Sequence, residues 1–269
     1  MKRFMLFSLL IVFVVAGVIV YFTYPKFVKQ KQNIPSNKKL FNIVMIGAAG
    51  SGKGTQSDLI KGKLNLLQIS AGEVLRNFVK ENPSDELTQT IKSYTDNGKL
   101  VPSEITHQLM KEKVQKDVLC AGCKYNGIIF DGFPREQAQL EFLDEMLAET
   151  NNKINAVVYI DIEMEKLVER LSGRFMCAKC GEIYHKITKP TKVDGVCDKC
   201  GHTEFKVRED DKNTDAIRQR FKIFEDQTKP LLNVYNQRGI VIKVDGTKGA
   251  KEISTELLEK LDEMMNNQK

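Results

Sequence analysis

The sequence predicts an α/β fold, in which helices cover both faces of a doubly wound, five-stranded parallel sheet. Short runs rich in Ile and Val alternate along the chain with helical stretches, the order that builds parallel βαβ units. These runs show little apolar–polar alternation, which indicates strands buried on both faces. A glycine-rich turn follows the first run, where such sheets bind ligands. A chain of 269 residues can bury one sizeable core with an appended segment.

Each predicted element follows from these runs. The strands are expected at residues 41–46, 66–69, 127–130, 156–160 and 239–244. Helices are expected at residues 53–61, 103–117, 135–149, 164–171, 215–237 and 250–265. A ligand should therefore lie outside the carboxyl ends of the strands.

The N-terminal segment is predicted to be a single transmembrane anchor over residues 4–24. Its 21 residues are almost all apolar, and as a helix they would span about 31 Å, close to the hydrocarbon core of a bilayer. A cleaved signal peptide is the alternative, but the run is long for one and no small-x-small cleavage site follows it. Residues 25–39 form a polar, lysine-rich linker. Its lysines favour a cytoplasmic body, so we expect a single-pass membrane location with the lipid bilayer as a partner.

The charge distribution argues against a nucleic-acid-binding protein. The net charge is +6, but the first 40 residues hold seven of the 41 basic residues and none of the 35 acidic ones. The remainder is therefore near neutral and shows no basic stripe.

The strongest chemical signal is GAAGSGKGT at residues 47–55, directly after the first predicted strand. Glycines allow a tight turn there, and the N–H groups of the following helix then face the phosphates of a nucleotide. Lys53 can reach the β- and γ-phosphates. The predicted ATP-binding residues of this loop are Gly47, Gly50, Ser51, Gly52, Lys53, Gly54 and Thr55.

A carboxylate after a second predicted strand supports the prediction of nucleotide binding. The apolar run 127–130 delivers Asp131 to the same edge of the sheet as the loop. This placement suits a magnesium contact through water.

Two of the three CxxC pairs predict a metal site. Cys177, Cys180, Cys197 and Cys200 have the spacing of a structural four-thiolate zinc site. Two disulfides are the alternative and would need an oxidising compartment. Cys120 and Cys123 lack a second pair, so they are interpreted as free thiols or as a redox-labile pair.

From about residue 40 to the C-terminus the chain resembles the nucleoside monophosphate kinases, and most closely the adenylate kinases with a long, zinc-binding lid. Four motifs carry the resemblance: the loop 47–56, the segment 69–76, the sequence DGFPR at 131–135, and the lid entered at RLSGR and left at REDD. The family usually has Pro where this chain has Ala49. The resemblance implies one kinase domain over residues 40–269, with a helical clamp for the acceptor monophosphate at 70–101 and a lid at 173–211.

The clamp residues imply how the acceptor nucleotide is bound. Arg76 and Arg135 would hold its phosphate, and the segment with Lys99 and Val101 would lie along its base. The remaining acceptor residues implied by the resemblance are Ser70, Ala71, Gly132 and Gln139. Ala71 is typical of UMP/CMP kinases, whereas Gln139 is typical of adenylate kinases. We give Gln139 more weight because an amide can hydrogen-bond a base edge in two places.

The lid residues imply how ATP is bound. By resemblance Arg170 stacks on the adenine, and Arg174, Arg208 and Arg220 surround the transferred phosphoryl group. One extra residue after Asp211 makes Arg218 an alternative to Arg220. Asp210 and Asp211 would latch the closed lid, or would simply cap a helix.

The function implied is reversible phosphoryl transfer from MgATP to AMP, giving two ADP, by a monomeric enzyme with Lys53, Arg135, Arg174, Arg208 and Arg220 as catalytic residues. A UMP/CMP or other monophosphate kinase is the first alternative. A membrane-tethered nucleotide sensor or scaffold is the second, but it would not need arginines at an acceptor site.

Overall fold

The computed structural model describes residues 39–118, 124–212 and 214–267. The predicted anchor 4–24, the linker 25–39 apart from Lys39, and the pair Cys120 and Cys123 lie outside these ranges. Within them, none of the helices combines the length and the apolar character needed to cross a membrane.

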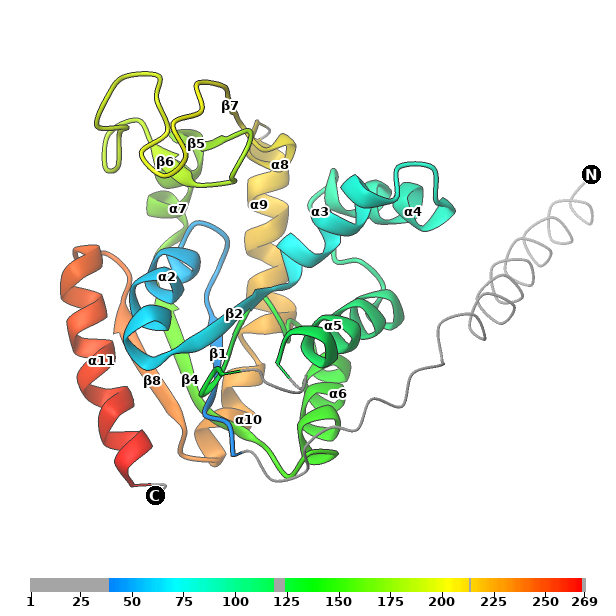
Figure 1. Ribbon diagram of the computed structural model, residues 1–269, viewed down its shortest axis with the longest axis vertical. Helices are drawn as coiled ribbons and strands as arrows, with labels where there is room; N and C mark the ends of the chain where they lie inside the picture. Colours follow the sequence, from blue (N-terminus) through cyan, green and yellow to red (C-terminus); the bar gives the residue numbers. More distant parts are fainter. Residues whose placement is uncertain (1–38, 119–123, 213, 268–269) are drawn as a thin grey trace, which may run out of the picture. The chain divides into compact units, whose positions relative to one another are not determined.

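A five-stranded parallel sheet forms the centre of the described fold, as predicted (Figure 1). Its strands lie in the order β2-β3-β1-β4-β8, so the first strand of the chain is the central one. The bounds are β1 Asn42–Ile46, β2 Leu66–Ser70, β3 Gly127–Asp131, β4 Ile154–Asp161 and β8 Val241–Asp245. Because all five strands are parallel, their carboxyl ends meet along one edge of the sheet.

Side chains of the central strand divide between two cores. In β1, Ile43 and Met45 pack on one face of the sheet, and Val44 and Ile46 pack on the other. All four side chains are at most 2 % exposed. Burial on both faces is why the strand has no polar alternation in its sequence.

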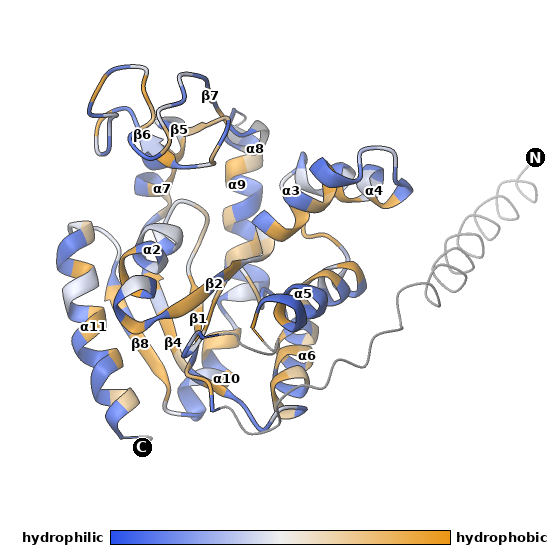
Figure 2. Cartoon of the chain, viewed as in Figure 1, coloured by the Kyte–Doolittle hydropathy of each residue, from blue (hydrophilic) through white to orange (hydrophobic). Residues whose placement is uncertain are grey.

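Two layers of helices cover the sheet, and their apolar sides face it (Figure 2). Helices α2 (Lys53–Leu64) and α11 (Ala250–Asn266) cover one face. The other face is covered by α5 (Ser103–Asp117), α6 (Gln137–Ala148), α7 (Met164–Ser172) and α10 (Leu231–Gln237). This arrangement confirms the predicted doubly wound fold.

The predicted helix 215–237 is not one continuous helix. It comprises α9 (Thr214–Ile223), a π-helical segment η2 (Phe224–Thr228) and α10. Pro230, directly before α10, lacks the N–H that a continuous α-helix would need there. At the end of η2 the N–H of Lys229 donates to the carbonyl of Phe224, five residues earlier (2.8 Å).

Two insertions project from the carboxyl edge of the sheet. The first contains α3 (Ala71–Glu81) and α4 (Glu86–Thr95), which pack around Leu75, Ile91 and Val101. The second contains a three-stranded antiparallel sheet in the order β6-β5-β7, which the sequence analysis did not predict. Its strands are β5 Arg174–Cys177, β6 Ile183–His185 and β7 Phe205–Lys206, and α8 (Glu209–Lys212) leads out of it.

Candidate active site

The glycine-rich loop lies between β1 and α2, at the carboxyl edge of the sheet. Gly47 is tightly enclosed, because a Cβ there would lie 2.6 Å from Ser51 Oγ and 2.9 Å from the carbonyl oxygen of Ile160. Gly52 adopts φ 104°, a left-handed conformation that costs glycine little, and it directly precedes α2. The loop can therefore present the first N–H groups of α2 to an anion. Gly50, Ser51, Gly54 and Thr55 lie on the same turn or in the first turn of α2.

Lys53 is the first residue of α2, and its ammonium group bends back into the loop. Nζ donates to the carbonyl oxygens of Gly47 (2.7 Å) and Ala48 (3.0 Å). Burial lowers the pKa of Lys53 to about 8; Asp131 opposes the shift, whereas Arg135, Arg220 and Arg174 add to it. An ammonium surrounded by other cations needs an anionic partner, which a polyphosphate would supply.

Asp131 ends β3, next to the strand from which the loop emerges. It pairs in register with Met45 of β1 and with Ser70 of β2. One carboxylate oxygen would lie 3.7 Å from a Cβ placed at Gly54, so the carboxylate faces the start of α2. This is the position expected for a carboxylate that holds a magnesium ion through water.

Arg135 is held by the turn that follows β3. Its Nε donates to the carbonyl oxygen of Gly132 (2.9 Å), and its carbonyl accepts from Thr228 Oγ1 (2.8 Å) in η2. The backbone N–H of Arg135 donates to Gln139 Oε1 (2.9 Å). Gln139 is only 2 % exposed, and its amide nitrogen lies 3.4 Å from Ser103 Oγ. The side-chain orientation of Gln139 is thus fixed from two sides.

The predicted clamp residues come from the insertion between β2 and α5. Ser70 ends β2 and precedes α3, and Ala71 is buried as the first residue of α3. Arg76 lies one turn further along α3 and folds back over Gly72, where a Cβ would lie 3.0 Å from its Nη1. Val101 is buried in the apolar cluster of the insertion, whereas Lys99 is exposed. Ala71 therefore packs with the core of the large sheet, whereas Val101 packs within the insertion.

Asp211 joins two of the predicted arginines. Its carboxylate is fully buried, accepts two hydrogen bonds from Arg174 Nε and Nη2 (2.7 Å each), and accepts one from Arg220 Nη1 (3.0 Å). Arg220 is 16 % exposed, whereas Arg218 is 62 % exposed and pairs with Asp215 at 3.8 Å. The extra residue before α9 therefore leaves Arg220, not Arg218, facing the site. The side chain of Asp210 lies outside the described part of the chain.

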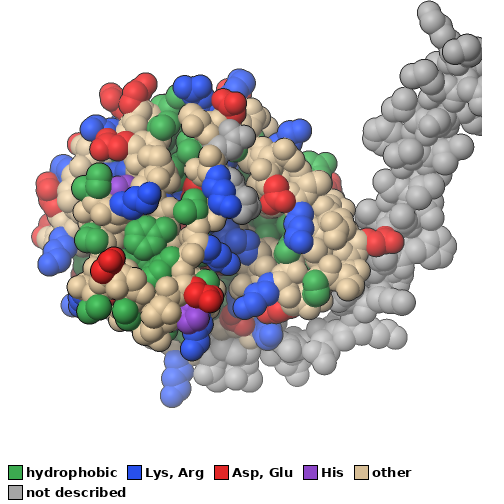
Figure 3. Space-filling model, turned by 90° about the horizontal axis from the view of Figure 1, so that it is seen from above, with side chains coloured by type: hydrophobic (Ala, Val, Ile, Leu, Met, Phe, Trp, Pro, Cys, Tyr) green, Lys and Arg blue, Asp and Glu red, His purple; other side chains and the backbone are tan. Residues whose placement is uncertain are grey.

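Of the remaining two lid-side arginines, Arg208 belongs to the second insertion, whereas Arg170 lies on α7, just before it. Arg208 lies close enough to Arg174 to lower its pKa, an effect second only to burial. Arg170 on α7 bridges two loops, with Nη2 donating to the carbonyl of Gly246 (2.8 Å) and Nη1 to that of Ser51 (3.4 Å). Seen from above, Lys and Arg side chains gather near the middle of the face that carries these insertions (Figure 3).

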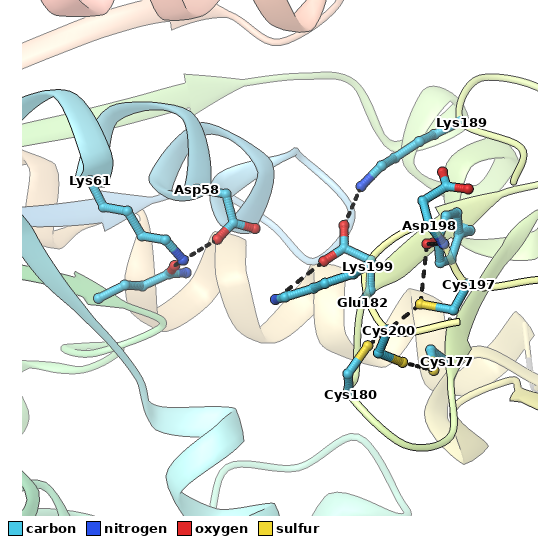
Figure 4. Close-up of polar contacts among 12 residues, drawn as sticks. Asp58, Lys61, Cys177, Cys180, Glu182, Lys189, Cys197, Asp198, Lys199 and Cys200 are labelled. Atoms are coloured by element: carbon cyan, nitrogen blue, oxygen red, sulfur yellow. Dashed lines mark hydrogen bonds and ion pairs between the residues drawn. The ribbon is translucent and has the colours of Figure 1, made fainter. Parts of the chain in front are cut away.

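The four predicted metal ligands converge in the second insertion (Figure 4). The thiol sulfurs of Cys177, Cys180, Cys197 and Cys200 all lie within 4.8 Å of one another. Two of these separations are 3.6 Å, from Cys177 to Cys200 and from Cys180 to Cys197. A disulfide requires about 2.05 Å, whereas four thiolates at about 2.3 Å from one ion are about 3.8 Å apart. The donor set fits a tetrahedral metal site.

One thiol of this cluster has an environment that favours the thiolate. Burial alone would raise the pKa of Cys197, but hydrogen bonds from the Tyr184 hydroxyl and from the backbone N–H groups of Lys199 and Cys200 lower it to about 6. The thiolate is the form that binds metal.

Some residues at the site were not found by sequence reasoning. Thr228 and Gly246 contact Arg135 and Arg170 through single hydrogen bonds from segments distant in sequence. Tyr184 was assigned no role from the sequence, yet its hydroxyl lies 3.4 Å from Cys197 Sγ. The cross-strand pairing in the insertion brings it there, and strands this short show no periodicity from which that sheet could be predicted.

The chain is similar to a large set of known proteins. A family model described as adenylate kinase matches residues 45–240. An adenylate kinase of Archaeoglobus fulgidus is 41 % identical over 80 % of this chain and 95 % of its own length. An adenylate kinase of Zymomonas mobilis is 40 % identical over 82 % of this chain and 96 % of its own length. An adenylate kinase of Staphylococcus epidermidis is 37 % identical over 83 % of this chain and 100 % of its own length.

These comparisons contradict the predicted membrane location. The matches account for 95–100 % of these relatives' own length, so the domain they share with this chain is nearly the whole of each relative. No helix in the ranges that the structure describes can span a bilayer. We therefore correct the prediction of a single-pass membrane enzyme with the bilayer as a partner.

The family match covers more than two thirds of the chain, and the relatives are matched almost end to end. On these grounds, together with the loop and arginines described above, the chain belongs to the adenylate kinase family and is an enzyme of that type.

Proposed function

We propose that this enzyme transfers a phosphoryl group reversibly from MgATP to AMP, giving two ADP. The observation that carries this assignment is the convergence of Arg135, Arg174 and Arg220, whose charges all act on the buried ammonium of Lys53, as does that of Asp131. Cations repel one another at such density, and a polyanion placed among them removes the repulsion. The transferred group and its two nucleotides supply such an anion.

Charge neutralisation and positioning are the chemistry that these residues supply. The acceptor is already an anionic phosphate, so the reaction needs little proton transfer. Lys53 and the loop N–H groups bind the ATP phosphates. Arg174, Arg208 and Arg220 approach from the lid side and Arg135 from the turn after β3, so that charge is balanced on both sides of the transferred group.

Asp131 is assigned to the magnesium that accompanies ATP. It would hold the ion through water, with Thr55 and the loop nearby, and the ion would neutralise charge shared between the phosphates. The position of the carboxylate opposite the first turn of α2 supports this assignment.

The clamp, residues 70–101, is assigned to AMP. Arg76 binds the acceptor phosphate with Arg135, and Ser70, Lys99, Val101 and Gly132 line the space beside it. Gln139 is assigned to the base. Gln139 Oε1 accepts from the N–H of Arg135, so contact with the base falls to its amide NH₂. That group would exchange its long contacts to Ser103 Oγ (3.4 Å) and Glu136 Oε1 (3.5 Å) for an acceptor atom of the adenine.

The lid, residues 173–211, is assigned to ATP and to a structural zinc ion. Arg170, at the base of the lid, is assigned to the adenine. Cys177, Cys180, Cys197 and Cys200 would hold the zinc, which would stabilise an insertion whose apolar cluster is small. Closure of the lid and the clamp would exclude water and prevent hydrolysis of ATP.

The test is turnover of the protein with MgATP and each of AMP, CMP, UMP and GMP. We expect AMP to be preferred, with Gln139→Ala losing most of that preference because an amide donor to the base is removed. Ala71→Thr is the matched second variant, because it adds the hydroxyl that adenylate kinases usually carry there. Preference for CMP or UMP would mean that the acceptor site binds pyrimidine nucleotides. Ala71, which is buried and lacks that hydroxyl, would then be the residue that indicates the acceptor base.

A further inference from the structure

Tyr184 is the most deeply placed large side chain of the lid. It lies on β6, is 1 % exposed, and packs its ring against Phe175 (centroids 5.5 Å apart) and Phe205 (5.7 Å). These rings and the buried cysteines form one cluster, separate from the two cores of the large sheet.

The hydroxyl of Tyr184 has two partners in this cluster. The backbone N–H of Asp198 donates to it (2.8 Å), and Cys197 Sγ lies 3.4 Å away. The first contact uses the hydroxyl oxygen as an acceptor, so the hydroxyl hydrogen remains to be donated to Cys197. A metal-bound thiolate is an acceptor, and such outer contacts orient ligands and strengthen metal binding.

The backbone of Tyr184 connects this contact to the phosphate-binding side of the lid. In the β5–β6 ladder Tyr184 pairs with Phe175, and the neighbouring pair is His185 with Arg174. Arg174 is fixed by two hydrogen bonds to buried Asp211. A rigid chain of contacts therefore leads from Cys197 through Tyr184 to the strand that begins at Arg174.

We propose that Tyr184 is a positioning residue for the metal site, holding Cys197 in ligand geometry and tying the metal to the strand that presents Arg174. The proposal rests on the zinc site proposed above. It predicts that the hydroxyl, and not only the ring, contributes to metal affinity.

The first measurement compares zinc binding by wild type, Tyr184→Phe and Tyr235→Phe, by competition with a chromophoric chelator. Tyr184→Phe keeps the ring and removes the hydroxyl, and we expect zinc affinity to fall about 10- to 100-fold. Tyr235→Phe is the matched control. Tyr235 is fully buried in the core between the large sheet and α5, α6 and α10, and its hydroxyl has no hydrogen-bond partner among the described residues. Its zinc affinity should equal that of wild type.

The second measurement separates positioning from packing. Thermal unfolding of wild type and Tyr184→Phe is recorded with zinc bound and with zinc removed, which forms a double cycle of hydroxyl and metal. A positioning role makes the zinc-dependent rise in Tm smaller in the variant. Equal losses of Tm with and without zinc would show that the hydroxyl only stabilises the fold, and would overturn the proposal.

The third measurement tests the connection to Arg174. As free zinc is lowered with a buffered chelator, the KM for ATP should begin to rise at a higher zinc concentration in Tyr184→Phe than in wild type. The KM for AMP should change by a smaller factor. An ATP KM that follows the same zinc dependence in both proteins would overturn the connection. If wild type binds no zinc, both the zinc site and the role of Tyr184 are overturned. If Tyr184→Phe binds zinc as tightly as wild type does, only the role of Tyr184 is overturned.

Discussion

At the scale of single residues, Asp211 organises the lid side of the active site. One fully buried carboxylate accepts hydrogen bonds from Arg174 and Arg220, so each guanidinium is fixed before any phosphate binds. Fixed donors cost little reorganisation when charge develops on the transferred group. Removing one partner of a buried ion pair leaves the others uncompensated, which makes this group sensitive to substitution.

The pair Arg220 and Arg218 gives a matched test of this arrangement. Arg220→Ala removes a cation that faces the site, and we expect kcat to fall about 100- to 1,000-fold. Arg218→Ala removes an exposed side chain with a distant ion pair, and kcat should stay within about two-fold of wild type. Steady-state kinetics with ATP and AMP, with circular dichroism as a check of folding, measure both. Comparable losses in the two variants would mean that Arg218 shares the role.

At the scale of elements, the two insertions differ in what holds them together. The clamp has an apolar cluster of its own around Leu75 and Ile91. The lid has short strands, three aromatic rings and four thiols, which is little apolar surface for a unit of its size. Its stability should therefore depend on the metal more than on packing.

Removal of zinc is expected to unfold the lid selectively. A chelator should expose the segment around residues 186–196 to protease while the large sheet keeps its circular dichroism, because that sheet has separate cores. Limited proteolysis with and without chelator measures this, and added zinc, but not added magnesium, should restore protection. Cleavage that is insensitive to the chelator would argue against a metal-stabilised lid.

At the scale of the whole molecule, the charges that bind phosphate work against folding of the free enzyme. Burial lowers the pKa of Lys53 from 10.5 to about 8. Between pH 8 and 10.5 the unfolded chain therefore binds a proton at Lys53 that the folded chain has released, so stability from this group increases as pH rises through that window. Below pH 8 the full penalty of the buried charge is present.

The contribution of Lys53 to the pH dependence of stability can be isolated with Lys53→Met, because methionine has no titrating group at that position. We expect the free energy of unfolding of wild type, relative to the variant, to increase from pH 8 to pH 10.5 by at most about 1.4 kcal/mol per pH unit. Urea unfolding of the nucleotide-free proteins at several pH values measures the difference. A difference that does not vary over this window would show that Lys53 keeps its ordinary pKa.

Much of this molecule could be predicted because its signals are local. Ile- and Val-rich runs predicted the strands, and the loop and the CxxC spacing predicted residues that the fold brings together. Other features depend on tertiary contacts: Pro230 and η2 divide a helix that looks continuous, and Tyr184 reaches Cys197 through a sheet too short to show periodicity. The choice between Arg218 and Arg220 depended on the exact phase of α9, which one extra residue left open.

The close approach of the clamp to α9 has a consequence for the order of events during turnover. Gly98 lies directly against α9, where a Cβ would meet the carbonyl of Ala216 and Cγ of Arg220, each at 3.1 Å. The clamp, proposed to bind AMP, thus contacts the same helix whose Arg220 is proposed to act on the phosphoryl group of ATP. When one nucleotide moves the clamp or the lid that binds it, the position of α9 relative to the other nucleotide changes. The two substrates should therefore bind interdependently, each altering the apparent affinity of the other by an equal factor.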